Sequence, residues 1–260
     1  MRIIFSRKGF DSGSGGKPSP IIDGVPVSLP IPGTRDEPYT YGDLTHPRAG
    51  SLADLATEIT KGRITGRNPA HYDPQIPWET GIASLGQQSA AQTHLINQGV
   101  TSGDTIVFFG LFRDYTAPKG HPNAKPHHRI FGVMTIDRLC ALGEDVRPGA
   151  WRALGLPQPH PHTERKHSLA NNAIWIGQGQ LAHHAGPDLR LTQTDAAPSL
   201  WDIPCWLRRC GLSYHASPHR WSDGELRLVA RGQEFVSNVG QDDEALDWLA
   251  DIQHSLPNPS

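Results

Sequence analysis

The chain opens with a short apolar strand that runs directly into charged residues and a glycine-rich loop. This segment, SRKGFDSGSGGKPSPI, begins at Ser6. Successive N–H groups in a glycine-rich turn can bind an anion, and Arg7 and Lys8 would add positive charge there. Side chains alternate along a strand, so the two cations should point to opposite faces. The alternative is a surface loop in which Asp11 and Ser12 cap a turn.

The segment HYDPQI places a histidine and an acid two positions apart. In an extended segment His71 and Asp73 would face the same way, and such a pair can chelate a metal or transfer protons. An Asp-Pro turn with a hydrogen-bonded histidine is the alternative. Asp73 is therefore a candidate acid or base, and Trp78 nearby is a candidate stacking surface for a base or simply part of the core.

The segment ARGQEFV carries Arg231, Gln233 and Glu234 around a glycine. A glycine within a strand often marks a bulge that redirects side chains near a site, which we expect at Gly232. The apolar residues that follow draw Glu234 towards the core and favour it as a general base. A structural bulge with a buried Arg231–Glu234 ion pair is the alternative.

Two amides and one further cation complete the candidates. Gln87 and Gln92 lie in LGQQSAAQTHL, and glutamine can read a base edge through its paired donor and acceptor. Close helix packing through the alanines of this segment is the alternative explanation. Arg113 ends the buried strand FFGLFR, where a cation could contact a phosphate or pair with a neighbouring acid.

The candidates fall into two groups. The acid or base candidates are Asp11, Asp73 and Glu234, and the binding candidates are Ser6, Arg7, Lys8, Ser12, Gln87, Gln92, Arg113, Arg231 and Gln233. We assign no metal ligand from the sequence. His160 and His162 stand in a proline-rich segment without an adjoining acid, so we expect them to be solvated. The spacing of Cys205 and Cys210 is poor for zinc.

The elements that must position these residues are strands and a few helices. Strands are predicted over 2–6, 105–113, 127–139 and 174–177, with the second and third paired as antiparallel neighbours. Helices are predicted from a capping Ser51 to a stop at Gly62, over 85–98, and over 242–256, where Asp242 caps the first turn. This pattern predicts a single α+β domain over residues 1–260.

Composition limits the function classes. The 260 residues carry a net charge of −2, so binding to nucleic acid would need a local basic patch. No apolar run is long enough for a membrane span, and charge interrupts the N-terminal apolar residues before a signal peptide could form. Three cysteines are typical of a reduced cytoplasmic protein.

Several segments of the chain resemble those of two known families. GVTSGDTIVFFGLFR followed by HHRIFGVMTID resembles the core of PUA-like barrels, which commonly bind RNA or modified bases. Along nearly the whole chain, SRKGFDS, SLPIP, HYDPQI, LGQQSAAQTHL, SYHASPHRW and ARGQEFV resemble the nucleotide modification associated domain 3 family. The first resemblance implies a partly open PUA-like β-barrel elaborated by helices and long loops. The second implies a bacterial or phage protein that works with DNA base modification systems.

These observations support three hypotheses. The first is a protein that binds a nucleotide or modified base in a pocket shared by the first strand, the Gly232 segment and Arg113. The second is an enzyme acting on a nucleotide or base adduct, with or without a metal held by His71 and Asp73. The third is a scaffold that contacts other DNA-modification enzymes. The expected partner is a nucleotide or nucleic acid, DNA before RNA, and the sequence specifies no cofactor.

Overall fold

The computed structural model describes residues 1–115, 125–143, 146–147, 149–164, 171–230 and 232–257. Its centre is a mixed sheet with the strand order β16-β1-β10-β11-β12-β9. These strands are β16 (Glu234–Asn238), β1 (Arg2–Arg7), β10 (Thr105–Asp114), β11 (His127–Ala141), β12 (Ala173–Leu181) and β9 (Gly81–Gln87). β1 is parallel to β10, and the other pairs along this path are antiparallel. β2 (Ser19–Ile22) extends the end of β10 and pairs with β3 (Val25–Pro26).

The sheet is strongly curved but open. No strand pairing joins its two outer strands β16 and β9 among the residues that the structure describes, so the predicted PUA-like barrel is not confirmed. The outer strands nevertheless approach each other, because Gln87 at the end of β9 hydrogen-bonds to Glu234 at the start of β16. α2 (Ser89–Asn97) follows β9 directly and contacts β16. The fold is a mixed α+β structure around an open sheet.

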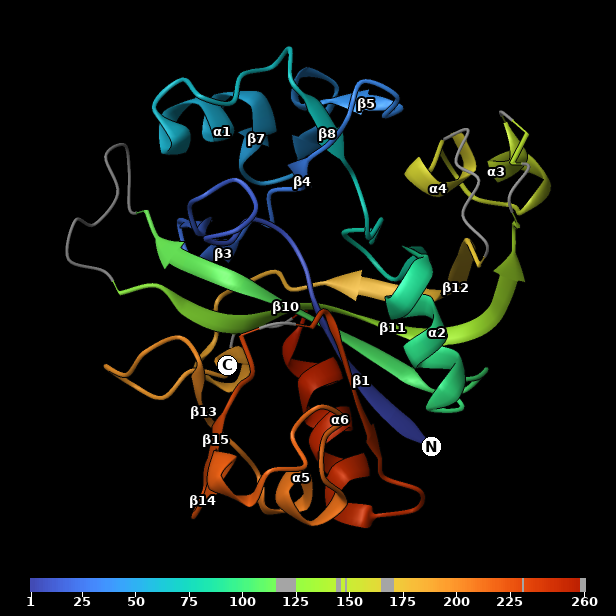
Figure 1. The fold of residues 1–260 in the computed structure, drawn as a ribbon. Helices are drawn as coiled ribbons and strands as arrows, with labels where there is room; N and C mark the ends of the chain where they lie inside the picture. The colour runs from blue at the N-terminus through green and yellow to red at the C-terminus, as the bar shows by residue number, and fades with distance from the viewer. Residues whose placement is uncertain (116–124, 144–145, 148, 165–170, 231, 258–260) are drawn as a thin grey trace.

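Alternation along the strands gives the sheet two apolar faces. On one face Ile4, Ile106, Phe108 and Trp175 pack with Leu95 of α2. The opposite face packs against the C-terminal part of the chain, which Figure 1 shows below the sheet. That part contains η2 (Pro187–Leu189), β13 (Leu200–Asp202), α5 (Cys205–Cys210), η3 (Pro218–Arg220), β14 (Trp221–Ser222), β15 (Glu225–Arg227) and α6 (Asp243–Ser255).

Residues 25–80 form a smaller apolar cluster on the other side of the sheet (Figure 1). Its elements are β4 (Ile31–Pro32), β5 (Tyr39–Thr40), η1 (Tyr41–Asp43), β6 (Thr45–His46), β7 (Gly50–Ser51), α1 (Leu52–Thr60) and β8 (Pro69–His71). β4 and β5 both pair with β8, which fixes the chain just before Asp73. Two short helices, α3 (Ala150–Ala153) and α4 (Pro161–Glu164), lie beyond the far end of β11.

Most predicted elements are confirmed. The strands at 2–6, 105–113 and 127–139 are present, and the last two pair as antiparallel neighbours. Both predicted caps are present: Ser51 accepts a hydrogen bond from the Asp54 N–H, and Asp242 accepts one from the Ala245 N–H. The strand predicted at 174–177 is longer than expected. None of the described helices has the length and apolar character needed to cross a membrane.

Two local predictions are wrong. Residues 85–87 were expected in a helix, but they belong to β9 because they pair with β12, and the helix begins only at Ser89. Gly232 was expected inside a strand, but it lies in the connection that precedes β16 and has a φ of 107°. A left-handed φ of this kind suits glycine and breaks the strand instead of bulging it.

Candidate functional site

A cavity of about 760 Å³ lies where segments distant in the sequence meet. It is lined by the end of β1, by β4 and the connection from β4 to β5, by β8 and Asp73, by the first turn of α2, and by residues around Gln233. The sheet positions several of these segments. The pairing of β1 with β16 places the end of β1 beside Gln233 and Glu234, and β9 leads directly into α2. The curvature of the sheet then brings these strand ends to one place.

A buried ion pair with an amide partner forms one wall of the cavity. Lys8 Nζ lies 2.8 Å from Glu234 Oε1, and their side chains are 9% and 1% exposed. Gln87 Nε2 donates to the same oxygen at 2.5 Å. The second oxygen, Oε2, is buried without a hydrogen-bond partner among the described residues. The wall therefore presents a carboxylate that is anchored through one oxygen only.

Arg7 and Lys8 leave β1 on opposite sides, as the alternation predicts. The Arg7 guanidinium donates to the carbonyl oxygens of Val229 and Ala230, each at 3.1 Å, and lies near the rings of Phe109 and Phe235. Burial lowers the pKa of Arg7, partly offset by the charge of Asp11. Arg7 thus holds the segment before β16 in place at the edge of the cavity.

Asp73 is the most constrained acid of the site. Its side chain is 5% exposed, and its Oδ1 accepts a hydrogen bond from the Gly86 N–H at 2.9 Å. His160 Nε2 lies 3.3 Å from the same oxygen, although not aligned as a standard hydrogen bond. Burial alone would raise the pKa of Asp73, but the contact with His160 and the nearby charges of Lys8 and His162 lower it below the usual range. Asp73 is therefore ionised near neutral pH.

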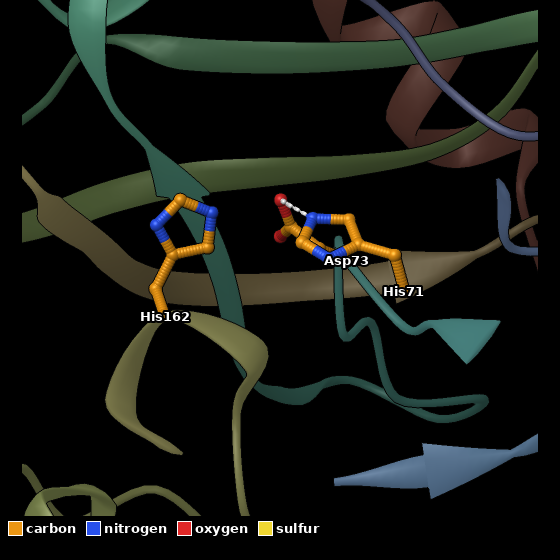
Figure 2. Close-up of side chains that lie close together, drawn as sticks. All are labelled: His71, Asp73 and His162. Carbon is orange, nitrogen blue, oxygen red and sulfur yellow. Dashed lines mark ion pairs between the residues drawn. The ribbon is translucent and has the colours of Figure 1, made fainter. Parts of the chain in front are cut away.

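Two histidines face Asp73 from different parts of the chain. His71 on β8 and His162 on α4 approach the carboxylate from opposite sides in Figure 2. His71 Nδ1 contacts both oxygens of Glu37, at 3.1 and 3.2 Å. His162 Nδ1 lies 2.6 Å from Asn172 Oδ1. Burial lowers the pKa of His162 to about 4, against the opposing effect of Asp73, so the ring is neutral near pH 7.

The expectation that His160 and His162 are solvated is wrong. His160 is fully buried and His162 is 5% exposed. The sequence shows no adjoining acid, but the fold supplies Asp73 from a segment almost ninety positions earlier. The proline-rich sequence indicated a loop here, but the segment forms the short helix α4, which packs against β9.

The structure brings most of the candidate residues to this cavity. Those that line it are Arg7, Lys8, Asp11, Asp73, Gln87, Gln233 and Glu234. Asp11 does so as the cap of its own loop, because its Oδ1 accepts from the N–H groups of Gly13 and Ser14. Gln233 is exposed, and its carbonyl oxygen accepts from the Arg7 N–H at 2.7 Å.

Four of the other candidates lie elsewhere. Ser6 is fully buried in the sheet, and Ser12 is exposed in the loop, away from the cavity lining. Gln92 is buried and accepts a hydrogen bond from Trp175 Nε1 at 2.9 Å. Arg113 lies near the far end of β10 beside Tyr115, and not at this cavity. Arg231 lies outside the described residues, so a pairing with Glu234 stays a prediction.

Sequence reasoning gave no role to three residues of the site, Glu37, His94 and Tyr214, and wrongly expected a fourth, His162, to be solvated. The Tyr214 ring is stacked on His94 with centroids 4.3 Å apart, lines the cavity and is 54% exposed. Its φ of 66° is left-handed, which is unusual for an aromatic residue. Only the motif SYHASPHRW pointed to this region, and its pattern alone gives Tyr214 no role.

Comparisons with known proteins give one match. The model of a family described as nucleotide modification associated domain 3 matches residues 2–238, which is most of the chain and includes every residue of the cavity named above. The search of curated proteins and the search of solved structures give no match.

Proposed function

Because the chain belongs to the nucleotide modification associated domain 3 family, which associates it with nucleotide modification systems, we propose that it binds a nucleotide or a modified base in the cavity beside α2. The observation that carries the proposal is the composition of this one cavity: cations, amides, carboxylates and an exposed aromatic ring lie together. The volume of about 760 Å³ is within the range of small-molecule sites and suits a nucleotide.

The phosphate of such a ligand has a favourable position at the first turn of α2. Ala90 and Ala91 line the cavity there, the side chain of the N-cap residue Gln88 makes no capping hydrogen bond, and the first turn carries no acid. The N-terminus of a helix attracts anions through free N–H groups and the helix dipole. Arg7 and Lys8 line the same cavity and add positive charge, although Glu234 offsets that of Lys8.

The base has a stacking surface and amide partners. The exposed ring of Tyr214 is supported from behind by His94 and so offers a rigid platform. Gln233 is exposed at the cavity and provides both a donor and an acceptor for a base edge. A base within a duplex would have to leave the helical stack to reach this position.

The test is a thermal-shift screen of the full chain against canonical and modified nucleoside monophosphates, followed by titration calorimetry with the best ligand. We expect at least one nucleotide to stabilise the protein. Tyr214→Ala should weaken that ligand by about 1–3 kcal/mol through lost stacking. Ile96→Ala is the matched control, since Ile96 is 49% exposed on α2 but does not line the cavity.

Two results would contradict the proposal. One is the absence of stabilisation by any nucleotide. The other is binding that Tyr214→Ala leaves unchanged, which would place the ligand elsewhere. Capture of a modification enzyme by a protein that binds no nucleotide would favour the scaffold hypothesis instead.

A further inference from the structure

Three potential metal ligands converge within the cavity. One atom from each of His71, Asp73 and His162 lies within 4.8 Å of the others. All three side chains are largely buried, at 15%, 5% and 5% exposure, and all three line the cavity. They come from two segments far apart in the sequence, which Figure 2 shows meeting at the carboxylate.

Neighbouring residues orient both rings. Glu37 offers only acceptor oxygens to His71 Nδ1, so that nitrogen donates and Nε2 is the atom left to bind a metal. Asn172 donates through Nδ2 to the His162 carbonyl oxygen at 3.1 Å, which leaves its Oδ1 to accept from His162 Nδ1 at 2.6 Å. His162 Nε2 is therefore likewise the atom left to bind a metal. Such outer contacts are the usual way in which metal-binding histidines are oriented.

Among the described residues, no lysine or arginine forms an ion pair with Asp73, and the ring nitrogens close to its carboxylate belong to His71 and His160. His71 Nε2 lies 3.9 Å from Asp73 Oδ2, too far for a hydrogen bond, so the two ligand nitrogens and the carboxylate face one another without a direct bond. The nearest lysine, Lys8, is already paired with Glu234 at 2.8 Å. We infer that His71, Asp73 and His162 form a site for one divalent transition-metal ion, bound through two Nε2 atoms and a carboxylate oxygen.

The donor set selects the class of ion. Two imidazoles and one carboxylate suit Zn²⁺, Fe²⁺ or Mn²⁺ and are unlike the all-oxygen sets of Mg²⁺ and Ca²⁺. At metal–ligand distances of about 2.1 Å, tetrahedral donors lie about 3.4 Å apart, so the side chains draw together slightly when the ion binds. Three protein ligands leave at least one coordination position open, and the cavity is where it opens.

An open position distinguishes a catalytic site from a structural one. An ion here would polarise a ligand oxygen or lower the pKa of a bound water, next to the position proposed for the nucleotide. The metal site itself is inferred from side chains alone. That the ion acts on a nucleotide or base adduct rests on the proposed function.

The test uses the full chain without a polyhistidine tag, stripped with a chelator and titrated with Zn²⁺ and separately with Mn²⁺ in the absence of nucleotide. We expect one ion per chain for the unchanged protein. His71→Gln and His162→Gln should each abolish stoichiometric binding. Glu37→Gln, which keeps an acceptor but removes the charge behind His71, should weaken binding about 10- to 100-fold. His254→Gln, an exposed histidine on α6, is the control and should bind normally.

The fold of each stripped variant is checked by circular dichroism and thermal unfolding, and His71→Gln is the mildest change because His71 is the most exposed of the three ligands. No binding by the unchanged protein, or one-to-one binding that survives both histidine substitutions, would overturn the inference. Metal binding without nucleotide binding would refute the proposed function and leave the metal site standing. Nucleotide binding without metal binding would refute the metal site and leave the proposed function standing.

Discussion

At the scale of single residues, four buried or half-buried histidines differ in what their Nδ1 atoms do. In His46 and His128 this nitrogen accepts: from the N–H groups of Arg48 and Ala49 in the first, and from Trp201 Nε1 in the second. In His71 and His162 it faces an oxygen and therefore donates. The first pair uses this nitrogen in packing contacts, whereas the second pair has Nε2 left to face Asp73. His127 and His215 also donate through Nδ1, to the carbonyl oxygens of Lys125 and Ser213, so this polarity marks the site only in combination with the position beside Asp73.

His128 makes the stability of the protein depend on pH. Burial, with smaller effects from the charges of Arg7 and His127, lowers the pKa of His128 to about 3. The unfolded chain takes up a proton below its pKa of about 6.5 while the folded state does not, so stability falls as the pH drops from about 6.5 towards 3. At pH 5 the loss from this residue is about 2 kcal/mol. Urea unfolding at pH 7.5 and 5.0 measures it.

The variant His128→Asn provides the control for this effect. Asparagine places an acceptor oxygen near the position of Nδ1, so the bond from Trp201 can be retained without a titrating group. Its stability should decline less between the two pH values than that of the unchanged protein. Equal declines would show that His128 does not titrate as its burial requires.

At the scale of elements, the end of β9 organises the site. The Gly86 N–H donates to Asp73, Gln87 donates to Glu234, and the His162 ring packs directly on the Gly86 backbone. β12 holds this end of β9 in register, since Gly86 pairs with Ile174 and Gln87 with Ala173. The end of β9 thus contacts both Asp73, which faces the histidines, and Glu234, which pairs with Lys8.

We predict that Gly86→Ala disrupts the site through sterics. A Cβ atom at this position would overlap the His162 ring, so the ring must move. Overpacking of this kind costs about 1–3 kcal/mol, and displacement of His162 should also weaken Zn²⁺ binding. Urea unfolding and metal titration are the two measurements.

Gly81→Ala is the matched control in the same strand. Its Cβ would meet its nearest neighbour at 3.6 Å, an ordinary contact. We expect it to leave the metal affinity unchanged and to cost less stability than Gly86→Ala. If both variants behave alike, the packing of His162 on Gly86 has no part in positioning the site.

At the scale of the whole molecule, curvature of the open sheet creates the cavity. The two outer strands, β16 and β9, are not paired in the described part of the chain, yet Glu234 and Gln87 meet across the gap between them. The chain as a whole carries a net charge of −2, so attraction to a phosphate must come from groups at the cavity and not from the overall field. Recognition is therefore expected to be local, involving one nucleotide and few phosphates.

Salt dependence tests this expectation. Binding of a short single-stranded DNA through one or two phosphates should weaken only about 3- to 7-fold when the salt concentration rises from about 50 to 200 mM. Fluorescence anisotropy at several salt concentrations gives the slope. A loss on the order of a thousandfold would contradict local recognition and indicate an extended nucleic-acid surface.

The sequence by itself determined the elements whose signals are local. Alternation and β-favouring residues located β1, β10 and β11, and capping residues located the starts of α1 and α6, because such preferences act within a few residues. It also pointed to the segments that carry Lys8, Asp73 and Glu234. Residues 85–87 were assigned to the wrong element because their composition favours a helix, while their pairing with β12 outweighs that preference.

Only the tertiary structure decided which of these polar residues meet. It separated Arg113 and Gln92 from the cavity and added Glu37, His162 and Tyr214 to it. The physical reason is that the site combines positions near 8, 72, 162 and 234, whose proximity depends on strand order and sheet curvature. Neither property leaves a periodic trace in the sequence, since both arise from contacts between segments far apart along the chain.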